Sequence, residues 1–187
     1  MPDVVSMARA AADGLRDFFD LPCAFFGHSV GALIAYEVAE LLEHEGTGVR
    51  CLFVSAARAP HIVDLKRSHL LSDADFLAEL RSIKGTPEEL LGNPEVMQLL
   101  LPVIKSDFKA VQNYRCRPAR LRCPIYAFSG RNDLEVSEQE IDGWRSYTAG
   151  AFGATVLDGD HFFIHTQHQQ IAATIRGLLR PAMRLGS

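Results

Sequence analysis

Hydrophobic and polar positions follow two different patterns in the first third of the chain. Apolar residues recur every three or four positions over residues 3–19, which predicts an amphipathic helix that ends before Pro22. The runs at 23–27 and 49–56 are short, apolar and without polar alternation, and a helical pattern over 31–45 separates them. Such runs are typical of parallel strands that helices cover on both faces.

The middle of the chain, from about residue 60 to 118, contains no convincing strand. A capping box predicts a helix over 73–83, and caps followed by proline at 86–87 and 93–94 predict two further helix starts. Pro102 falls inside the last of these patterns and predicts a kink or a break. We therefore expect one all-helical insertion.

Alternation returns in the last third of the chain. The pattern predicts a strand over 124–130, a helix over 138–148, a strand over 153–159 and a final helix over 162–180. Strands that alternate with helices indicate a doubly wound α/β fold with a parallel sheet of about four strands. A chain of 187 residues has the size of a single domain.

Composition changes this picture little, but it excludes several classes of protein. The net charge of −4 gives no electrostatic reason to expect nucleic acid or an anionic membrane as a partner. No run approaches the roughly 18 apolar residues of a membrane span, and the first residues lack the basic and apolar regions of a signal peptide. The four cysteines form no C-x-x-C pair, so we expect reduced thiols in a cytoplasmic protein.

The sequence Gly-His-Ser-Val-Gly, residues 27–31, lies where the first predicted strand passes into a helix. A turn of this pattern lifts the central serine, Ser29, above the sheet edge, and Gly27 and Gly31 lack the Cβ atoms that would clash in it. The alternative is that Ser29 only caps the helix, although a cap needs neither glycine. We expect a nucleophile, and a serine nucleophile needs a base that an acid orients.

The acid and the base should follow later strands, in the chain order serine, acid, histidine. Asp133 comes just after the third predicted strand and is the candidate acid, with Glu135 in reserve. A plain turn residue is the alternative for Asp133. His161 comes just after the last predicted strand and is the candidate base, whereas His165 and His168 fall on the final helix.

The three histidines His161, His165 and His168 also lie near one helical face, which raises the question of a metal site. A zinc protease pattern needs glutamate directly after the first histidine, and this chain has Phe162 there. No other ligand cluster appears in the sequence, so we expect no metal. We expect His28 to pack beside the serine turn.

The chain resembles the α/β-hydrolase thioesterase family, specifically the type II thioesterases of polyketide and nonribosomal peptide assembly lines. The likeness rests on the segments FGHSVGALIAYEVA, SGRND and DGDHFF. Residues 85–114 strengthen it, because they look like the helical lid of that subfamily. The likeness covers nearly the whole chain.

The resemblance implies an enzyme that hydrolyses acyl groups from the phosphopantetheine arm of acyl or peptidyl carrier proteins, without a cofactor. Position by position, it makes Ser29 the nucleophile, Asp133 the acid and His161 the base. The backbone N–H of Val30, directly after the nucleophile, becomes one oxyanion donor.

An apolar stripe runs along the expected lid, and either core packing or a cover over the acyl chain would use it. The members that we expect to bind substrate are Leu99, Val103, Phe108 and Val111. Four arginines follow within residues 114–123. A docking site for an acidic carrier protein and a solvated loop are both open interpretations of them.

The chain departs from the family at its N-terminus. The family places strands and a glycine-rich oxyanion loop before the helix that starts at Val4, and this chain shows no such segment. We therefore expect a single, N-terminally truncated domain over 1–187 that lacks one oxyanion donor and is impaired in activity. The strand at 23–27 would then be an exposed apolar edge that favours self-association. A smaller departure is Asp160, where the family has glycine.

Two other functions stay open on the sequence. One is a general serine carboxylesterase of the same fold, which substrate preference would distinguish from a carrier-protein thioesterase. The other is an inactive module that binds an acyl chain or a carrier protein. Labelling of Ser29 by a serine-directed fluorophosphonate would exclude that second alternative.

Overall fold

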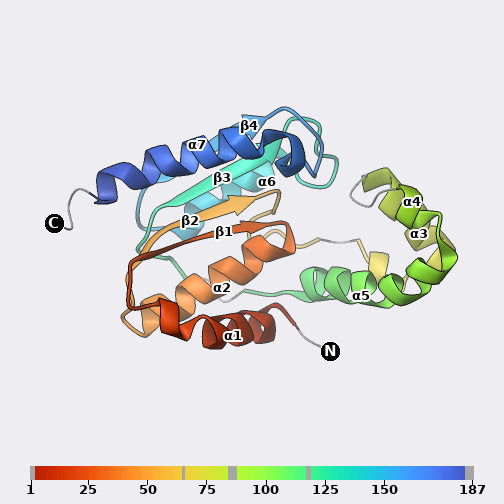
Figure 1. The fold of residues 1–187 in the computed structure, drawn as a ribbon, viewed down its shortest axis with the longest axis horizontal. Coiled ribbons are helices and arrows are strands. Elements are labelled where there is room, and N and C mark those ends of the chain that lie inside the picture. The colour runs from red at the N-terminus through yellow and green to blue at the C-terminus, as the bar shows by residue number, and fades with distance from the viewer. Residues whose placement is uncertain (1–2, 65, 84–87, 117–118, 184–187) are drawn as a thin grey trace.

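A parallel β-sheet organises the molecule. The computed structural model describes residues 3–64, 66–83, 88–116 and 119–183, with side chains described up to residue 180. The four strands are all parallel and lie in the order β1-β2-β3-β4 (Figure 1). They are β1 (Cys23–His28), β2 (Val49–Ser55), β3 (Ile125–Gly130) and β4 (Phe152–Leu157). The predicted α/β fold is confirmed.

Helices cover both faces of this sheet (Figure 1). One face packs against α1 (Val4–Gly14), α2 (Val30–His44), α6 (Glu138–Asp142) and the 3₁₀-helix η3 (Gly143–Tyr147), and the other against α7 (Ile164–Met183). Along β2, Leu52 and Val54 join the cluster on the α2 face, whereas Cys51 and Phe53 join the cluster on the α7 face. Both faces of the strand are therefore buried, which explains its unalternated apolar run.

A helical insertion between β2 and β3 lies beyond the carboxyl ends of β1 and β2 (Figure 1). It comprises η2 (Ser68–Leu70), α3 (Asp73–Ile83), α4 (Glu88–Leu91) and α5 (Pro94–Asn113). The insertion has a small apolar core of its own, made by Phe76, Leu80, Leu91, Met97 and Leu101. Of all described helices, none is both long and apolar enough to cross a bilayer.

The start of α5 follows the predicted cap, because Asn93 Oδ1 accepts a hydrogen bond from the N–H of Val96 at 3.2 Å. The start predicted at 86–87 lies outside the described residues. Pro102 does not break α5, which continues to Asn113. Pro102 and Gln98, whose carbonyl loses its helical partner, are both exposed, so water can satisfy that carbonyl.

Other boundaries also differ from the expected ones, including that of α7, which begins at Ile164 and not at 162. The first helix ends at Gly14 and is followed by a 3₁₀-helix, η1 (Arg16–Phe18). The helix expected to reach 148 ends at Asp142, where η3 takes over. β4 ends at Leu157, because residues 158–163 form bends and a turn before α7 begins.

β1 forms one edge of the sheet, since among the described strands it pairs only with β2. Phe26 on this strand is 38% exposed. An open strand edge of this kind offers unpaired backbone groups to another strand.

Candidate active site

Ser29 occupies a strained turn between β1 and α2. Its backbone has φ 53° and ψ −124°, a conformation that residues other than glycine rarely adopt. Its N–H donates to the carbonyl of Ser55 at 2.8 Å, and its carbonyl accepts from the N–H of Ala32 at 3.0 Å. The side chain makes no capping bond to α2, so the interpretation of Ser29 as a helix cap is wrong.

The two glycines of the turn differ in importance. A Cβ on Gly27 would lie 2.1 Å from the carbonyl oxygen of Gly31, so only glycine allows β1 and α2 to approach this closely. A Cβ on Gly31 would meet nothing within 4 Å. The expectation that Gly31 also prevents a clash is therefore wrong, because that residue already belongs to the first turn of α2 and its Cβ position is open.

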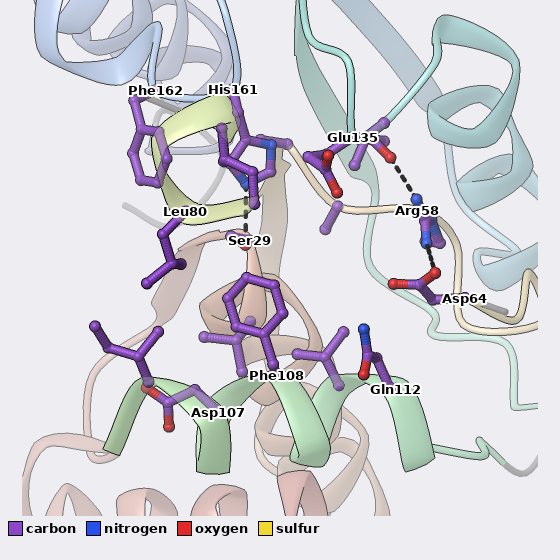
Figure 2. Close-up of a pocket in the computed structure, with 17 residues that line it drawn as sticks. Ser29, Arg58, Asp64, Leu80, Asp107, Phe108, Gln112, Glu135, His161 and Phe162 are labelled. Atoms are coloured by element: carbon purple, nitrogen blue, oxygen red, sulfur yellow. Dashed lines mark hydrogen bonds and ion pairs between the residues drawn. The ribbon is translucent and has the colours of Figure 1, made fainter. Parts of the chain in front are cut away.

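The structure brings Ser29, His161 and Asp133 together in one hydrogen-bonded row (Figure 2 shows the first two). His161 Nε2 lies 3.2 Å from Ser29 Oγ, and His161 Nδ1 lies 2.9 Å from Asp133 Oδ2. The Asp133 side chain is fully buried and the His161 side chain is 9% exposed. With a neutral ring, Nδ1–H donates to the carboxylate and Nε2 accepts from the hydroxyl, which is the arrangement that activates a serine.

Close backbone contacts hold the acid and base loops against each other. A Cβ on Gly130 would lie 2.4 Å from the carbonyl oxygen of Asp160, so these loops touch through their main chains. The N–H of Asn132 donates to the carbonyl of Gly159 at 2.9 Å, and Gly159 itself has φ +135°. Only glycine takes that φ readily, so the turn before His161 depends on it.

The competing candidates have other partners. The Glu135 carboxylate accepts hydrogen bonds from Lys66 Nζ at 2.9 Å. His165 and His168 are exposed on α7, and neither lines the cavity beside Ser29. Asp160 Oδ1 accepts from the N–H of Phe162 and does not orient His161. Within the described part of the chain, no three histidine, cysteine or acidic side chains are grouped as metal ligands.

His28 packs beside the turn. Its Nδ1 lies 2.9 Å from Ser55 Oγ, and its ring centre lies 5.5 Å from that of His161. Burial, with the nearby His161 as a smaller cause, lowers the pKa of His28 to about 4. His28 is therefore neutral at physiological pH and adds no second positive charge beside the candidate base.

Ser29 and His161 open into a cavity of about 230 Å³ between the sheet edge and the insertion (Figure 2). Its apolar wall comes from Val30, Ala56, Ala57, Leu80, Ile83, Ile104, Phe108, Val111, Val136 and Phe162. Its polar wall comes from Arg58, Asp64, Asp107, Gln112 and Glu135. An apolar cavity with few polar groups suits an acyl chain.

The structure corrects two of the four expected lid residues. Phe108 and Val111 line the cavity, but Leu99 and Val103 are 76% and 57% exposed and lie outside it. The reason is helical phase: Leu99 and Val103 fall on the face of α5 opposite to the one that faces the sheet. Ile104, which was not among the expected lid residues, lines the cavity from the same helix.

The arginine-rich segment that follows α5 is partly engaged within the chain. Arg115 donates to the carbonyls of Gln112 and Tyr114, and Arg122 pairs with Glu43. Arg117 lies outside the described residues. The structure therefore gives Arg115 and Arg122 local, intramolecular roles.

Comparison with known proteins decides the family. The family model described as a thioesterase domain matches residues 1–179. This chain belongs to the thioesterase family. Thioesterase PikA5 of Streptomyces venezuelae is 40% identical over 154 residues, which are 81% of this chain and 55% of that protein. Gramicidin S biosynthesis protein GrsT of Aneurinibacillus migulanus is 37% identical over 168 residues, which are 88% of this chain and 66% of that protein.

Solved structures agree with this family. The type II thioesterase BorB, from the borrelidin biosynthetic cluster, superposes with a TM-score of 0.85 at 36% identity, covering 95% of this chain and 73% of BorB. The likeness to type II thioesterases and the α/β-hydrolase fold are thereby confirmed. The chain spans between 46% and 70% of the length of the first four curated relatives that it matches.

Proposed function

We propose that this chain hydrolyses acyl thioesters on the phosphopantetheine arm of acyl or peptidyl carrier proteins, in polyketide or nonribosomal peptide biosynthesis. The observation that supports this most is the hydrogen-bonded row of Ser29, His161 and Asp133 in the wall of an apolar cavity. The likeness to BorB and to YbtT, a type II thioesterase from the yersiniabactin pathway, supports the substrate class.

The first half-reaction acylates the serine. Ser29 Oγ attacks the thioester carbonyl carbon while His161 Nε2 takes the hydroxyl proton, and Asp133 stabilises the imidazolium that forms. The negative charge on the carbonyl oxygen lies next to the N–H of Val30, which begins α2 and has no intrahelical acceptor. The carbon–sulfur bond then breaks, and the proton on Nε2 passes to the sulfur, which leaves as the pantetheine thiol.

The second half-reaction releases the acid. A water molecule loses a proton to His161 Nε2 as its oxygen attacks the acyl carbon. The bond to Ser29 Oγ breaks, the serine regains the proton from His161, and the free carboxylic acid leaves the cavity. Phe108 and Val111 shield the acyl chain from bulk water through both steps.

Replacement of the serine tests this proposal. We expect Ser29→Ala to lower the hydrolysis of an acyl-pantetheine thioester by at least about 1,000-fold, because the nucleophile is gone. Ser146→Ala is a matched control, since Ser146 is exposed and its hydroxyl donates to the carbonyl of Gly143. Equal hydrolysis by wild type and Ser29→Ala would refute the assignment.

The same assay separates the alternatives. A carrier-bound thioester should be a better substrate than a free oxyester of equal acyl length, and the reverse preference would favour a general esterase. A fluorophosphonate should label Ser29 in the wild type. Tight acyl binding without labelling would favour an inactive binding module.

Self-association through the edge of β1 is a further expectation. The strand has an open side, and Phe26 on it is 38% exposed. Sedimentation over a range of concentrations measures association, and Phe26→Lys should reduce it because a charge on an edge strand opposes pairing. Equal association by both proteins would exclude this edge.

A further inference from the structure

We infer that Arg58 is a positioning residue for the catalytic acid: its guanidinium fixes the peptide unit that holds the Asp133 carboxylate in line with His161. This inference rests on the proposed triad and adds a fourth residue that acts through it. Neither the serine turn nor the acid and base loops contain this arginine, which comes from the segment after β2.

The segment that carries Arg58 is held firmly. Ala56, two residues earlier, has a positive φ of 50°, and its N–H donates to the carbonyl of Phe128 at 3.0 Å. The carbonyl of Ala57 accepts from the buried Trp144 Nε1 at 2.7 Å, and the N–H of Ala59 donates to the carbonyl of Glu140 at 3.1 Å. The backbone on both sides of Arg58 is thus anchored to β3 and to the segment after it.

All three guanidinium nitrogens of Arg58 lie close to oxygen atoms of the protein. Nη2 donates to the backbone carbonyl of Glu135, and Nη1 lies 3.1 Å from Asp64 Oδ1, as Figure 2 shows. Nε lies 3.2 Å from Glu140 Oε1 as an ion pair, at an angle that makes no hydrogen bond. The Arg58 and Asp64 side chains are only 17% and 15% exposed, so water screens this cluster weakly.

One peptide unit connects Arg58 to the acid. The carbonyl of Glu135, which Arg58 binds, and the N–H of Val136 belong to the same planar peptide group. That N–H donates to Asp133 Oδ1 at 3.1 Å, and the N–H of Glu135 donates to the same oxygen at 2.8 Å. A cation on the carbonyl end polarises the peptide and strengthens its N–H as a donor.

A second contact steadies the same segment from its other end. Glu140 Oε2 accepts from the N–H of Ser137 at 2.8 Å and closes the capping box that starts α6. Arg58 therefore binds the acid segment at the carbonyl of Glu135 and at the carboxylate of Glu140. Without the guanidinium, the carbonyl of Glu135 would lose this donor and the Glu140 carboxylate would lose its ion pair, although Glu140 would keep its bonds to Ser137.

Kinetics of Arg58 variants test the inference. We expect Arg58→Gln to lower kcat about 10- to 100-fold on an acyl-pantetheine thioester, since small displacements of an orienting group are costly. KM should change less than about threefold, because Nη1 and Nη2 already bind protein groups and Nε lies beside the Glu140 carboxylate. Arg58→Lys keeps the charge without the fork and should retain an intermediate kcat.

Arg131→Gln is the matched control. Arg131 lies two residues before Asp133 and pairs with Asp158 at 3.0 Å, but both side chains are well exposed. The substitution removes the same charge from the same rim, and we expect kcat within about twofold of wild type. An equal loss of kcat in Arg131→Gln and Arg58→Gln would overturn the inference.

A double-mutant cycle with Asp133→Asn isolates the pathway. If Arg58 acts through the acid, Arg58→Gln should cost less than about threefold once Asp133 is already replaced. Additive losses, a rise in KM at constant kcat, or a folded Arg58 variant with wild-type kcat would each overturn the inference. If Arg58→Gln does not fold, Arg58→Lys replaces it in the cycle with the same criteria. Wild-type hydrolysis that does not depend on Ser29 would refute the proposed function, and this inference with it.

Discussion

The rim of the sheet, formed by the ends of β1, β3 and β4 with the turns that follow, positions the side chains of the proposed triad through the backbone. Gly27 allows contact with the first turn of α2, and Gly130 allows contact with the turn before His161. The Asp133 carboxylate is fixed by two backbone N–H groups. A change at this rim therefore shifts the main chain and the side chains of the proposed triad together.

The helical insertion works differently. Its helices present side chains to the cavity only through their phase, so that Phe108 faces inward while Leu99 on the same helix faces solvent. A buried amide fastens α5 to the segment before α3: Gln112 Oε1 lies 2.6 Å from His69 Nδ1, and Gln112 Nε2 donates to Ser68 Oγ at 3.1 Å. A change here should alter one wall of the cavity and leave the proposed triad in place.

The largest effect that we expect from this contrast is at Gly27. In Gly27→Ala, the added Cβ would lie 2.1 Å from the Gly31 carbonyl oxygen and 2.5 Å from the Ala32 Cα, both main-chain atoms. The strand and the helix must separate, which should lower the free energy of unfolding by more than about 3 kcal/mol. Denaturant unfolding measures this.

Gly31→Ala is the matched control on the same turn. The new methyl group meets open space and removes a glycine from a helix, so we expect a gain of about 0.5–1 kcal/mol. Similar losses at both glycines would show that the turn is sensitive to any side chain and not to this one backbone contact.

The same contrast explains which features the sequence could predict. The four strands follow from apolar runs, and the order of serine, acid and histidine follows from the turns after three of them. Each of these turns needs a particular backbone conformation, and that conformation restricts which residues can occur there. Ser29, Asp133 and His161, which the structure brings together, could therefore be predicted from patterns that their backbones impose.

The side of α5 that faces the cavity was not predicted, although its helical spacing is present in the sequence. Met97, Leu101, Ile104, Phe108 and Val111 are separated by four, three, four and three residues, which is one continuous helical face. Leu99 and Val103 are also apolar and lie between members of that series, so the sequence alone does not show which of these residues share its face. Arg58 left no local pattern, because its partners at Glu135 and Glu140 are brought to it only by tertiary structure.

The next largest effect concerns pH and His28 at the rim. The folded protein holds the pKa of His28 at about 4, below its ordinary value of 6.5. Between these two values the unfolded chain binds a proton at His28 and the folded chain does not. The contribution of neutral His28 to the free energy of unfolding is therefore fully present above pH 6.5. It is lost as the pH falls towards 4, by about 3 kcal/mol. Denaturant unfolding at pH 7 and pH 4.5 should show most of this loss in the wild type.

His28→Asn removes the titrating ring while its amide can still reach Ser55, so its stability should depend less on pH over this range. His168→Asn is the control, since His168 is exposed and bonds through Nδ1 to the carbonyl of His165. It should retain the wild-type pH dependence. Identical slopes in all three proteins would mean that the buried histidine does not destabilise the fold in acid.

The smallest effect distinguishes the two faces of α5. Phe108 lines the cavity and packs edge-to-face on Phe76 with ring centres 5.1 Å apart, so Phe108→Ala removes both a wall and its support. We expect the ratio of kcat/KM for octanoyl- over acetyl-pantetheine to fall about tenfold, or about 1.4 kcal/mol of acyl-chain binding. Leu99→Ala should leave that ratio within about twofold, and because the ratio compares two substrates on one protein, partial unfolding cancels. A tenfold fall in Leu99→Ala as well would mean that the exposed face of α5 turns inward when a long acyl chain is bound.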